Sequence, residues 1–295
     1  MIKKTAILTL VWLLASCSPA PTLVPTTTPT MTTVPTTTET TVPTATATSL
    51  PTRKPTITRT PTLTPQETIV VMTYNILVGA GAGVTDPDSG ITGEDRLTKV
   101  LAVIKAVNPD ILGIEEATGW GDNGEARARQ VADDLGMNYA LGSSQVGYPV
   151  ALFTKFKIGK VYPCCFLPAT ANSGLHVEVV TGGGRVLQVY VVHLKNEPQD
   201  VTGLIQNMAP YIGQDTILMG DMNFQPFEAS AKQLTSAGWV FPMVMDSNII
   251  DQIWSSPSLA RGVWPQIALP SKLTYGASDH IPFVAKIGLY PPATK

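Results

Sequence analysis

Side chains that could bind a divalent cation or transfer a proton stand at the ends of apolar, strand-like runs in this sequence. In chain order they are Asn75, Glu116, His193, Asp221, Asn223, Asp251, Asp279 and His280. Carboxylate and amide oxygens are ligands that Mg²⁺ and Mn²⁺ prefer, and an imidazole changes its charge near neutral pH. Each residue stands where a strand would deliver it to one edge of a sheet. The pattern therefore predicts that several separate segments converge on one site.

Taken singly, each of these residues has an ordinary structural explanation. A carboxylate after a strand can be a turn residue or a helix cap, and the GDMN run at 220–223 can be a simple turn. A lone histidine after an apolar strand can be a hydrogen-bonded structural group. The prediction of a site therefore rests on the ordered set and not on any one member.

The elements that must position these residues follow from apolar, β-rich runs that alternate with amphipathic segments. The expected strands are Ile69–Tyr74, Asp110–Ile114, Val150–Thr154, Leu175–Val180, Arg185–Val192, Thr216–Met219, Ile249–Ser255 and Phe283–Ile287. Helices are expected from Leu97 to a stop at Asn108-Pro109, over Glu125–Leu135, and near Phe227–Ala237. Many strands in hairpins with a few helices predict an α+β sandwich of two sheets covered by helices, and parallel βαβ alternation fits less well.

The ordered set resembles the endonuclease/exonuclease/phosphatase superfamily, which includes deoxyribonuclease I, apurinic endonucleases, neutral sphingomyelinases and inositol polyphosphate 5-phosphatases. The resemblance runs from about Val70 to Ile287. Its most specific pieces are TYNI at 73–76, DILGIEE at 110–116, GDMN at 220–223 and SDH at 278–280. It implies a four-layer α/β/β/α sandwich of two mixed, mainly antiparallel sheets, and a metal-dependent hydrolase of phosphoesters.

Phosphoester hydrolysis needs a hard cation on a phosphate oxygen, a positioned water, and stabilisation of the charge on the leaving group. By resemblance, Glu116 is the principal ligand of Mg²⁺ or Mn²⁺, and Asn75 lies beside it. Asp279 is either a further metal ligand or a support for the neighbouring His280.

The resemblance also implies the catalytic residues. Asp221 and Asn223 match the pair that positions the nucleophilic water and the phosphate. His280 matches the essential imidazole near the scissile phosphate, and Asp251 matches the carboxylate that orients it. His193 matches a second histidine, a phosphate binder or general acid. Which histidine transfers which proton is left open.

The sequence departs from the family pattern in two places. Relatives often have Gln-Glu where this chain has Glu115-Glu116, so the extra carboxylate either alters metal affinity or points into the core. Nucleases of the family carry a carboxylate or tyrosine that partners the first histidine. The corresponding stretch here, GSSQVGYP at 142–149, has no acidic residue, and Gln145 or Tyr148 is the candidate substitute. His176 lies on an expected strand, and a structural role is expected for it.

The N-terminus predicts an export signal. Two lysines precede an apolar run, Ala6–Ala15, that is too short to span a bilayer. The tetrapeptide LASC that ends at Cys17 resembles the bacterial lipobox, in which cleavage exposes a cysteine that carries a diacylglyceryl group. We expect residues 1–17 to be a lipoprotein signal peptide. The alternative is an ordinary signal peptide with an incidental cysteine.

Residues 18–67 consist largely of Thr and Pro, so they cannot bury enough apolar surface to offset the entropy of ordering. This segment is expected to be an extended linker, and residues 68–295 are expected to be one catalytic domain. The whole protein is expected to be a monomer, anchored by lipid to a membrane of the cell envelope and facing outside the cytoplasm.

Residues 68–295 carry 15 Lys and Arg against 20 Asp and Glu, a formal charge of −5. Nucleic-acid binding without a metal usually needs a basic surface, although a bound cation can supply the positive field. Cys164 and Cys165 are adjacent, which disfavours a framework disulfide.

Three kinds of function are compatible with these observations. The leading one is hydrolysis of phosphodiester bonds outside the cell, with nucleic acid as the first substrate class. The alternatives within the family are a phospholipase C or sphingomyelinase-like activity and a phosphatase for small phosphomonoesters. An alternative of another class is a catalytically inactive surface binding module. An inactive module would not need the complete polar set.

Overall fold

The computed structural model of this protein describes residues 64–144, 146–162, 173–242, 249–265 and 269–291. The predicted signal segment, Cys17, nearly all of the Thr/Pro segment, and Cys164 and Cys165 lie outside these residues, so their predictions stay predictions. Within the described ranges, no helix has both the length and the apolar character needed to cross a bilayer.

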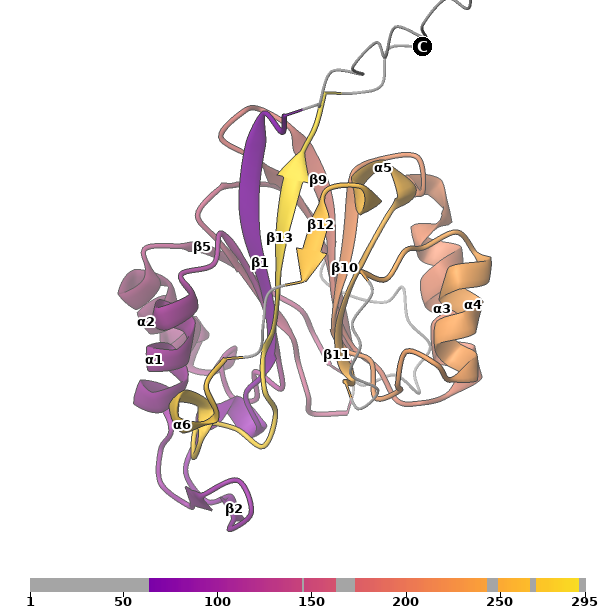
Figure 1. Ribbon diagram of the computed structural model, residues 1–295. Helices are drawn as coiled ribbons and strands as arrows, with labels where there is room; N and C mark the ends of the chain where they lie inside the picture. The colour runs from indigo at the N-terminus through magenta and orange to yellow at the C-terminus, as the bar shows by residue number, and fades with distance from the viewer. Residues whose placement is uncertain (1–63, 145, 163–172, 243–248, 266–268, 292–295) are drawn as a thin grey trace, which may run out of the picture. The chain divides into compact units, whose positions relative to one another are not determined.

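Two mixed sheets form the centre of the domain (Figure 1). The first sheet has the order β12 (Val263–Pro265), β13 (Phe283–Leu289), β1 (Glu67–Asn75), β4 (Ile111–Glu115), β6 (Ala151–Thr154) and β5 (Asn138–Leu141). The second has the order β11 (Asp251–Ser255), β10 (Thr216–Asp221), β9 (Val186–His193), β8 (Ser173–Val180) and β7 (Lys157–Tyr162). All neighbours in the two sheets are antiparallel except β1 with β4 and β9 with β10.

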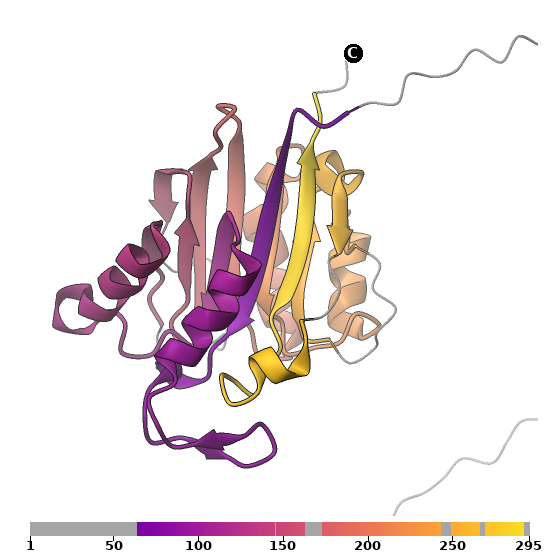
Figure 2. The same ribbon diagram turned by 60° about the vertical axis from the view of Figure 1, so that its left-hand side comes forward.

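Helices cover the outer faces of both sheets, as the two views of the domain show (Figures 1 and 2). On the side of the first sheet lie α1 (Leu97–Val107), α2 (Asp122–Leu135) and the short α6 (Ser271–Thr274). On the side of the second sheet lie α3 (Pro198–Met208) and α4 (Ala229–Ser236). The short α5 (Pro257–Ala260) follows β11, and single turns of 3₁₀ helix occur at Val78–Ala80 and Ala209–Tyr211. The predicted four-layer α/β/β/α sandwich is therefore confirmed.

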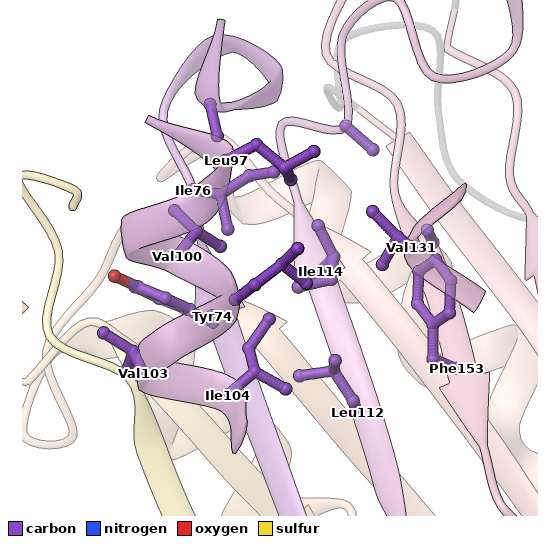
Figure 3. Packing of buried hydrophobic residues seen from close by; sticks show 14 of the residues in the cluster. Tyr74, Ile76, Leu97, Val100, Val103, Ile104, Leu112, Ile114, Val131 and Phe153 are labelled. Atoms are coloured by element: carbon purple, nitrogen blue, oxygen red, sulfur yellow. The ribbon is translucent and has the colours of Figure 1, made fainter. Parts of the chain in front are cut away.

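Helix α1 illustrates how the sequence dictates these layers. Asp95 accepts a hydrogen bond from the amide of Leu97 (3.0 Å), which satisfies one of the free donors at the start of the helix. Asn108 ends the helix in the left-handed conformation. Between these ends, the apolar spacing buries one face, and Figure 3 shows Val100 and Ile104 next to residues of β1 and β4. Burial of each such side chain stabilises the fold by roughly 1.5–3 kcal/mol.

Alternation along the strands divides the remaining core into two parts. In β1, Val71 faces the second sheet, whereas Met72 and Tyr74 face α1. In β10, Met219 faces the first sheet, whereas Leu218 faces α3 and α4. Both strands are apolar on both faces because both faces are covered.

Several elements were not predicted. Helix α3 has only a narrow apolar stripe, formed by Val201, Leu204 and Met208. Strand β7 lies at the edge of its sheet and is largely exposed, so it lacks an apolar run. Strands β5 and β12 are edge strands of four and three residues. The regular part of α2 begins after Glu125, since residues 123–125 have non-helical dihedral angles.

Parallel βαβ alternation was expected to fit less well than hairpins, and the sheets are indeed mainly antiparallel, but two βαβ units are present. Helix α1 connects the parallel strands β1 and β4, and α3 connects the parallel strands β9 and β10. These two units lie inside otherwise antiparallel sheets. They matter for function because the carboxyl ends of parallel strands are where ligands usually bind in such sheets.

Candidate active site

The predicted site residues continue the alternation that faces the space between the two sheets. In β1 the inward series ends at Asn75, in β9 it ends at His193, and in β10 it ends at Asp221. In β11 the series starts at Asp251, which pairs with Asp221, and Asp221 pairs with His193 on its other side. The site is therefore the polar end of the inter-sheet core, at the lower end of the sheets in Figure 1.

Asn75 connects the two sheets at this end. Its Nδ2 donates to Asp221 Oδ2 (3.0 Å) and to Glu116 Oε1 (3.2 Å). Its Oδ1 accepts a hydrogen bond from the amide of Leu77 (3.0 Å). With a side chain only 1% exposed and both amide atoms engaged, Asn75 fixes the separation of two carboxylates from different sheets.

Glu116 stands just after β4 with a φ of +58°, in the left-handed region that favours glycine. Its Oε2 accepts a hydrogen bond from the amide of Val78 (2.9 Å), and its Oε1 accepts from Asn75. Such a backbone costs about 1–2 kcal/mol, so the surrounding contacts must hold it in place. The turn directs this carboxylate toward Asn75.

Glu115, by contrast, points into the core. It is fully buried, and its Oε1 accepts a hydrogen bond from the Thr73 hydroxyl (2.8 Å). Burial raises the pKa of Glu115 well above its usual value, and the nearby charge of Asp251 acts in the same direction. Of the two possibilities for this extra carboxylate, the structure shows the side chain directed into the core.

His280 forms a hydrogen-bonded pair with Asp251, with 2.7 Å between Nδ1 and Oδ2. Burial favours the neutral ring, but the bond to Asp251 and the charges of Asp251, Asp221 and Asp279 outweigh it and raise the pKa of His280 to about 10. The other ring nitrogen, Nε2, lies 3.9 Å from Asp221 Oδ2. The arrangement holds a protonated imidazole whose Nε2 faces the site.

His193 lies on the other side of the same carboxylate, with Nε2 3.5 Å from Asp221 Oδ2. Burial lowers the pKa of His193, and the charge of Asp221 only partly opposes this effect. The ring of Tyr148 meets the His193 ring edge-on, with 5.9 Å between centroids, and is 40% exposed. Of the two candidate partners of His193 in the stretch 142–149, Tyr148 lies next to the ring. The other candidate, Gln145, lies outside the described residues.

Asn223 and Asp221 are joined by a tight turn. The amide of Asn223 donates to Asp221 Oδ1 (2.9 Å), and Asn223 Nδ2 donates to the carbonyl of Leu194 (2.9 Å). Asn223 has a φ of +53°, which asparagine tolerates better than most residues. The turn fixes both side chains of the GDMN motif relative to β9.

Ser278 holds the SDH motif, residues 278–280, in place. Its hydroxyl donates to the carbonyl of Asn75 (2.7 Å), and the amide of His280 donates to the same hydroxyl oxygen (3.2 Å). Asp279 is exposed, and its carboxylate is within hydrogen-bond distance of Ser278 Oγ (3.2 Å). Ser278 was part of the motif but had no assigned role. Its position shows that it ties the histidine segment to the end of β1.

The donor set fits a hard divalent cation. Asp221, Asp251 and His280 offer ligand atoms within 4.8 Å of one another. Asp251 and His280 already bond each other, so the carboxylates of Glu116 and Asp221, which share the Asn75 Nδ2 donor, suit Mg²⁺ or Mn²⁺ better. The crowded carboxylates repel one another, which a cation would relieve.

His176, for which a structural role was expected, is a packing residue. His176 stacks between Tyr162 and Tyr190, with ring centroids at 4.5 Å and 4.1 Å, and Nε2 lies 2.7 Å from Gln188 Oε1. Burial lowers the pKa of His176. The imidazole is therefore a neutral packing group on β8.

Comparison with solved structures shows the same fold in several proteins. The catalytic domain of human Nocturnin, solved with a bound sulfate anion, is 21% identical, with 76% of this chain and 95% of that chain covered and a TM-score of 0.58. A protein of Beutenbergia cavernae DSM 12333 named for its endonuclease/exonuclease/phosphatase family is 18% identical over 75% of this chain and 72% of that chain, with a TM-score of 0.56. The 3′ phosphatase NExo from Neisseria, bound to a product DNA hairpin, is 17% identical over 74% of this chain and 98% of that chain, with a TM-score of 0.53.

Comparison with curated protein sequences finds no match. The sequence profile of the Endonuclease/Exonuclease/phosphatase family matches residues 72–280, which span β1 to His280 and thus every strand end at the site. Members of this family are phosphoester hydrolases. The chain belongs to the Endonuclease/Exonuclease/phosphatase family.

Proposed function

We propose that this protein is a divalent-metal-dependent phosphodiesterase that acts on nucleic acid outside the cytoplasm. The observation that carries the proposal is the pair of imidazoles on either side of Asp221, one held protonated and one held neutral. Two groups whose surroundings separate their pKa values can serve as acid and base in one reaction. A surface binding module would have no need of this separation.

The chain's own residues would divide the work of hydrolysis. His280 would direct its Nε2 proton toward a phosphate oxygen, with Asp251 fixing the ring at Nδ1. Asp221 and Asn223 would orient the attacking water, because their turn is fixed by two hydrogen bonds. His193 is the neutral imidazole available to the second proton transfer, and the choice between the two histidines as general acid is left open.

Glu116 and Asn75, with Asp279 as a further candidate, are the residues we propose to hold Mg²⁺ or Mn²⁺. The bound cation would polarise a phosphate oxygen and stabilise the charge that develops on the leaving group. Asn75 and Glu116 would keep their oxygens in place through hydrogen bonds to backbone amides. Outer contacts of this type set ligand orientation in metal sites.

Nucleic acid is the proposed substrate class because of what two similar structures contain. NExo is a 3′ phosphatase bound to a product DNA hairpin, and ANGEL2, a 2′,3′-cyclic phosphatase, was solved with adenosine-2′,3′-vanadate. The alternatives are a phospholipid or sphingomyelin head group and a small phosphomonoester. The net negative charge of the domain disfavours long duplexes, which need a basic surface, so we propose short nucleic acids as substrates.

The location outside the cytoplasm is proposed from the sequence of the N-terminus. Lipidation of Cys17 would anchor a monomer in a membrane of the cell envelope. The Thr/Pro segment would then separate the catalytic domain from that membrane, at about 3.1 Å per extended residue.

The test is hydrolysis by the full-length protein of bis-p-nitrophenyl phosphate, single-stranded DNA and sphingomyelin, each with Mg²⁺, with Mn²⁺ and with EDTA. We expect EDTA-sensitive cleavage that the H280A variant loses by at least roughly 10²-fold. The H176Q variant is the matched control, because it removes a buried imidazole that packs between two tyrosines and should retain activity. Equal activity of H280A and wild type would refute the proposed mechanism. Cleavage of sphingomyelin alone would refute nucleic acid as the substrate class and support a phospholipid substrate.

A further inference from the structure

Arg96, just before α1, is a buried cation that the sequence analysis did not single out. Its side chain is 1% exposed. The guanidinium donates to the carbonyls of Ile76 (3.1 Å), Leu77 (2.5 Å) and Ala277 (2.5 Å). An arginine before an amphipathic helix is usually solvated. A complete burial of this kind therefore requires an explanation.

The three carbonyls belong to the two segments that carry the two halves of the site. Ile76 and Leu77 directly follow Asn75, and Ala277 precedes the SDH motif that ends in His280. These segments are about 200 residues apart in the sequence, and within the described contacts Ser278 provides another link between them through the carbonyl of Asn75. The rigid fork of a guanidinium can hold several acceptors at once, which an ammonium cannot do as well.

The segment after Asn75 needs such support because its backbone is strained. Leu77, Val78 and Ala80 have φ values of +54°, +49° and +54°. The left-handed region is unfavourable for each of them, and a β-branched residue such as Val78 is especially disfavoured there. The backbone amide of Arg96 also donates to the carbonyl of Ala80 (2.7 Å), so both ends of the strained turn are held by the same residue.

This strained turn orients the predicted metal ligand. The amide of Val78 donates to Glu116 Oε2, and the amide of Gly79 donates to the carbonyl of Glu116 (2.6 Å). A chain of contacts thus runs from the Arg96 guanidinium through the turn to the Glu116 carboxylate. A second chain runs through Ala277 to the His280 segment.

The charge of Arg96 also acts on the site. Burial lowers the pKa of Arg96, while Tyr74 and the carboxylates of Asp279, Asp95 and Glu116 oppose this effect. The guanidinium nevertheless remains protonated, because arginine does not lose its proton in proteins. Its hydrogen-bond acceptors are neutral carbonyls, so its positive charge is available to offset the nearby carboxylates.

We infer that Arg96 is a positioning residue that couples the turn after β1, which orients the predicted metal ligand Glu116, to the histidine segment before β13. This inference rests on the proposed function for its effect on catalysis. The Arg96 guanidinium bonds backbone carbonyls of the two segments, so we assign it a positioning role and not a catalytic one. It acts through the carbonyls of the two segments.

The experiment compares full-length wild type with the R96K and R96M variants, and with R185M as the control. Arg185 is also partly buried and bonds Asp215 and the carbonyl of Tyr290. Arg185 directly precedes β9 and lies eight residues before His193, which ends that strand. At the rise of an extended strand, the two residues are about 26 Å apart. R185M therefore removes a bonded arginine remote from the site.

Three quantities are measured: amide hydrogen exchange of peptides covering 76–80 and 276–281, Mn²⁺ affinity by electron paramagnetic resonance, and kcat and KM on bis-p-nitrophenyl phosphate. Both Arg96 variants should exchange faster in both segments and bind Mn²⁺ roughly 10-fold or more weakly. Their kcat should fall by about 10²-fold with a much smaller change in KM, because misplacement by about 1 Å has effects of that size. R185M should match wild type in all three quantities.

Unchanged exchange in either segment of R96K and R96M would overturn the inference, whatever their activity. Faster exchange with wild-type Mn²⁺ affinity and kcat would also overturn it, because Arg96 would then support the fold alone. If R96M does not fold, R96K still tests the role of the planar fork. A wild type without metal-dependent hydrolysis would refute the proposed function, and the exchange and Mn²⁺ measurements would still decide the role of Arg96.

Discussion

His193 and His280 lie on either side of the Asp221 carboxylate, yet their surroundings favour opposite charge states. His280 bonds a second carboxylate, Asp251, which stabilises the protonated ring. His193 is 4% exposed, and its Nδ1 is buried with no hydrogen-bond partner in the described part of the chain. Burial without a partner favours the neutral ring. The difference comes from the neighbours of each ring.

The D251N variant tests the cause of the raised pKa of His280. A folded-state pKa of about 10, against an ordinary value of 6.5, means that proton binding stabilises the fold. That contribution is complete below pH 6.5 and is lost as the pH rises through about 10. In EDTA, the free energy of unfolding of wild type should therefore fall between pH 6.5 and 10. The free energy of unfolding of D251N should fall much less over the same range. Urea unfolding at pH 6, 8 and 10 measures this, and equal slopes for the two proteins would contradict the assignment.

The E116Q variant tests the predicted metal ligand. Both oxygens of Glu116 accept N–H donors, so an amide nitrogen in place of one oxygen would set donor against donor. We expect the Mg²⁺ concentration for half-maximal activity to rise by about 10–100-fold, or activity to be lost. The control is E115Q, because it makes the same Glu-to-Gln change at the adjacent residue, whose side chain is buried and bonded to the Thr73 hydroxyl. An E116Q variant with the Mg²⁺ dependence of wild type would refute the role.

At the scale of elements, the position of Asp221 depends on a close approach of β10 to β9. Gly220 has a φ of +147°, and a Cβ there would lie 1.9 Å from the carbonyl oxygen of Val192. Only glycine allows the two strands to stay paired at this point, which is one residue before the site.

The G220A variant should therefore push β10 away from β9 and displace Asp221. We expect a loss of roughly 1–3 kcal/mol in unfolding free energy from the overpacking, together with a marked fall in kcat. Gly213 gives a matched control, since a Cβ there meets no atom within 4 Å. Thermal unfolding and bis-p-nitrophenyl phosphate hydrolysis measure both effects. Equal stability and activity of G220A and G213A would contradict this account of the strand.

At the scale of the whole molecule, the catalytic domain is preceded by a segment whose composition favours an extended linker. The four-layer domain buries its apolar residues in three clusters, one between the sheets and one under each pair of helices. The location that we propose for this domain, outside the cytoplasm, depends on the proposed lipid anchor at Cys17.

The C17A variant tests that anchor in a bacterial host that processes lipoproteins. Two acyl chains hold a protein firmly on a membrane, so wild type should sediment with membranes and C17A should be soluble or uncleaved. Metabolic labelling with a fatty acid, followed by fractionation, separates these outcomes. Labelling that persists in C17A, or identical fractionation of the two proteins, would refute lipidation at Cys17.

The two-sheet architecture and the polar ends of its strands follow from local patterns in the sequence. Runs such as IVVMTY alternate between two covered faces, and their periodicity directly predicts strands. The inward series of β1, β9 and β10 ends on Asn75, His193 and Asp221, so the site could be predicted as one cluster. Helix α3 and the edge strands escaped prediction because their exposed or narrow apolar patterns resemble those of loops.

The charge states of the histidines, the direction of the Glu115 side chain and the burial of Arg96 depend on contacts that form only in the folded chain. Protonation depends on burial and on neighbours that are distant in the sequence, such as Asp251 for His280. Glu115 and Glu116 differ because the chain turns to positive φ between β4 and the following loop. Arg96 acquires its acceptors only when residues 76–77 and 277 meet, and no local pattern in the sequence encodes that contact.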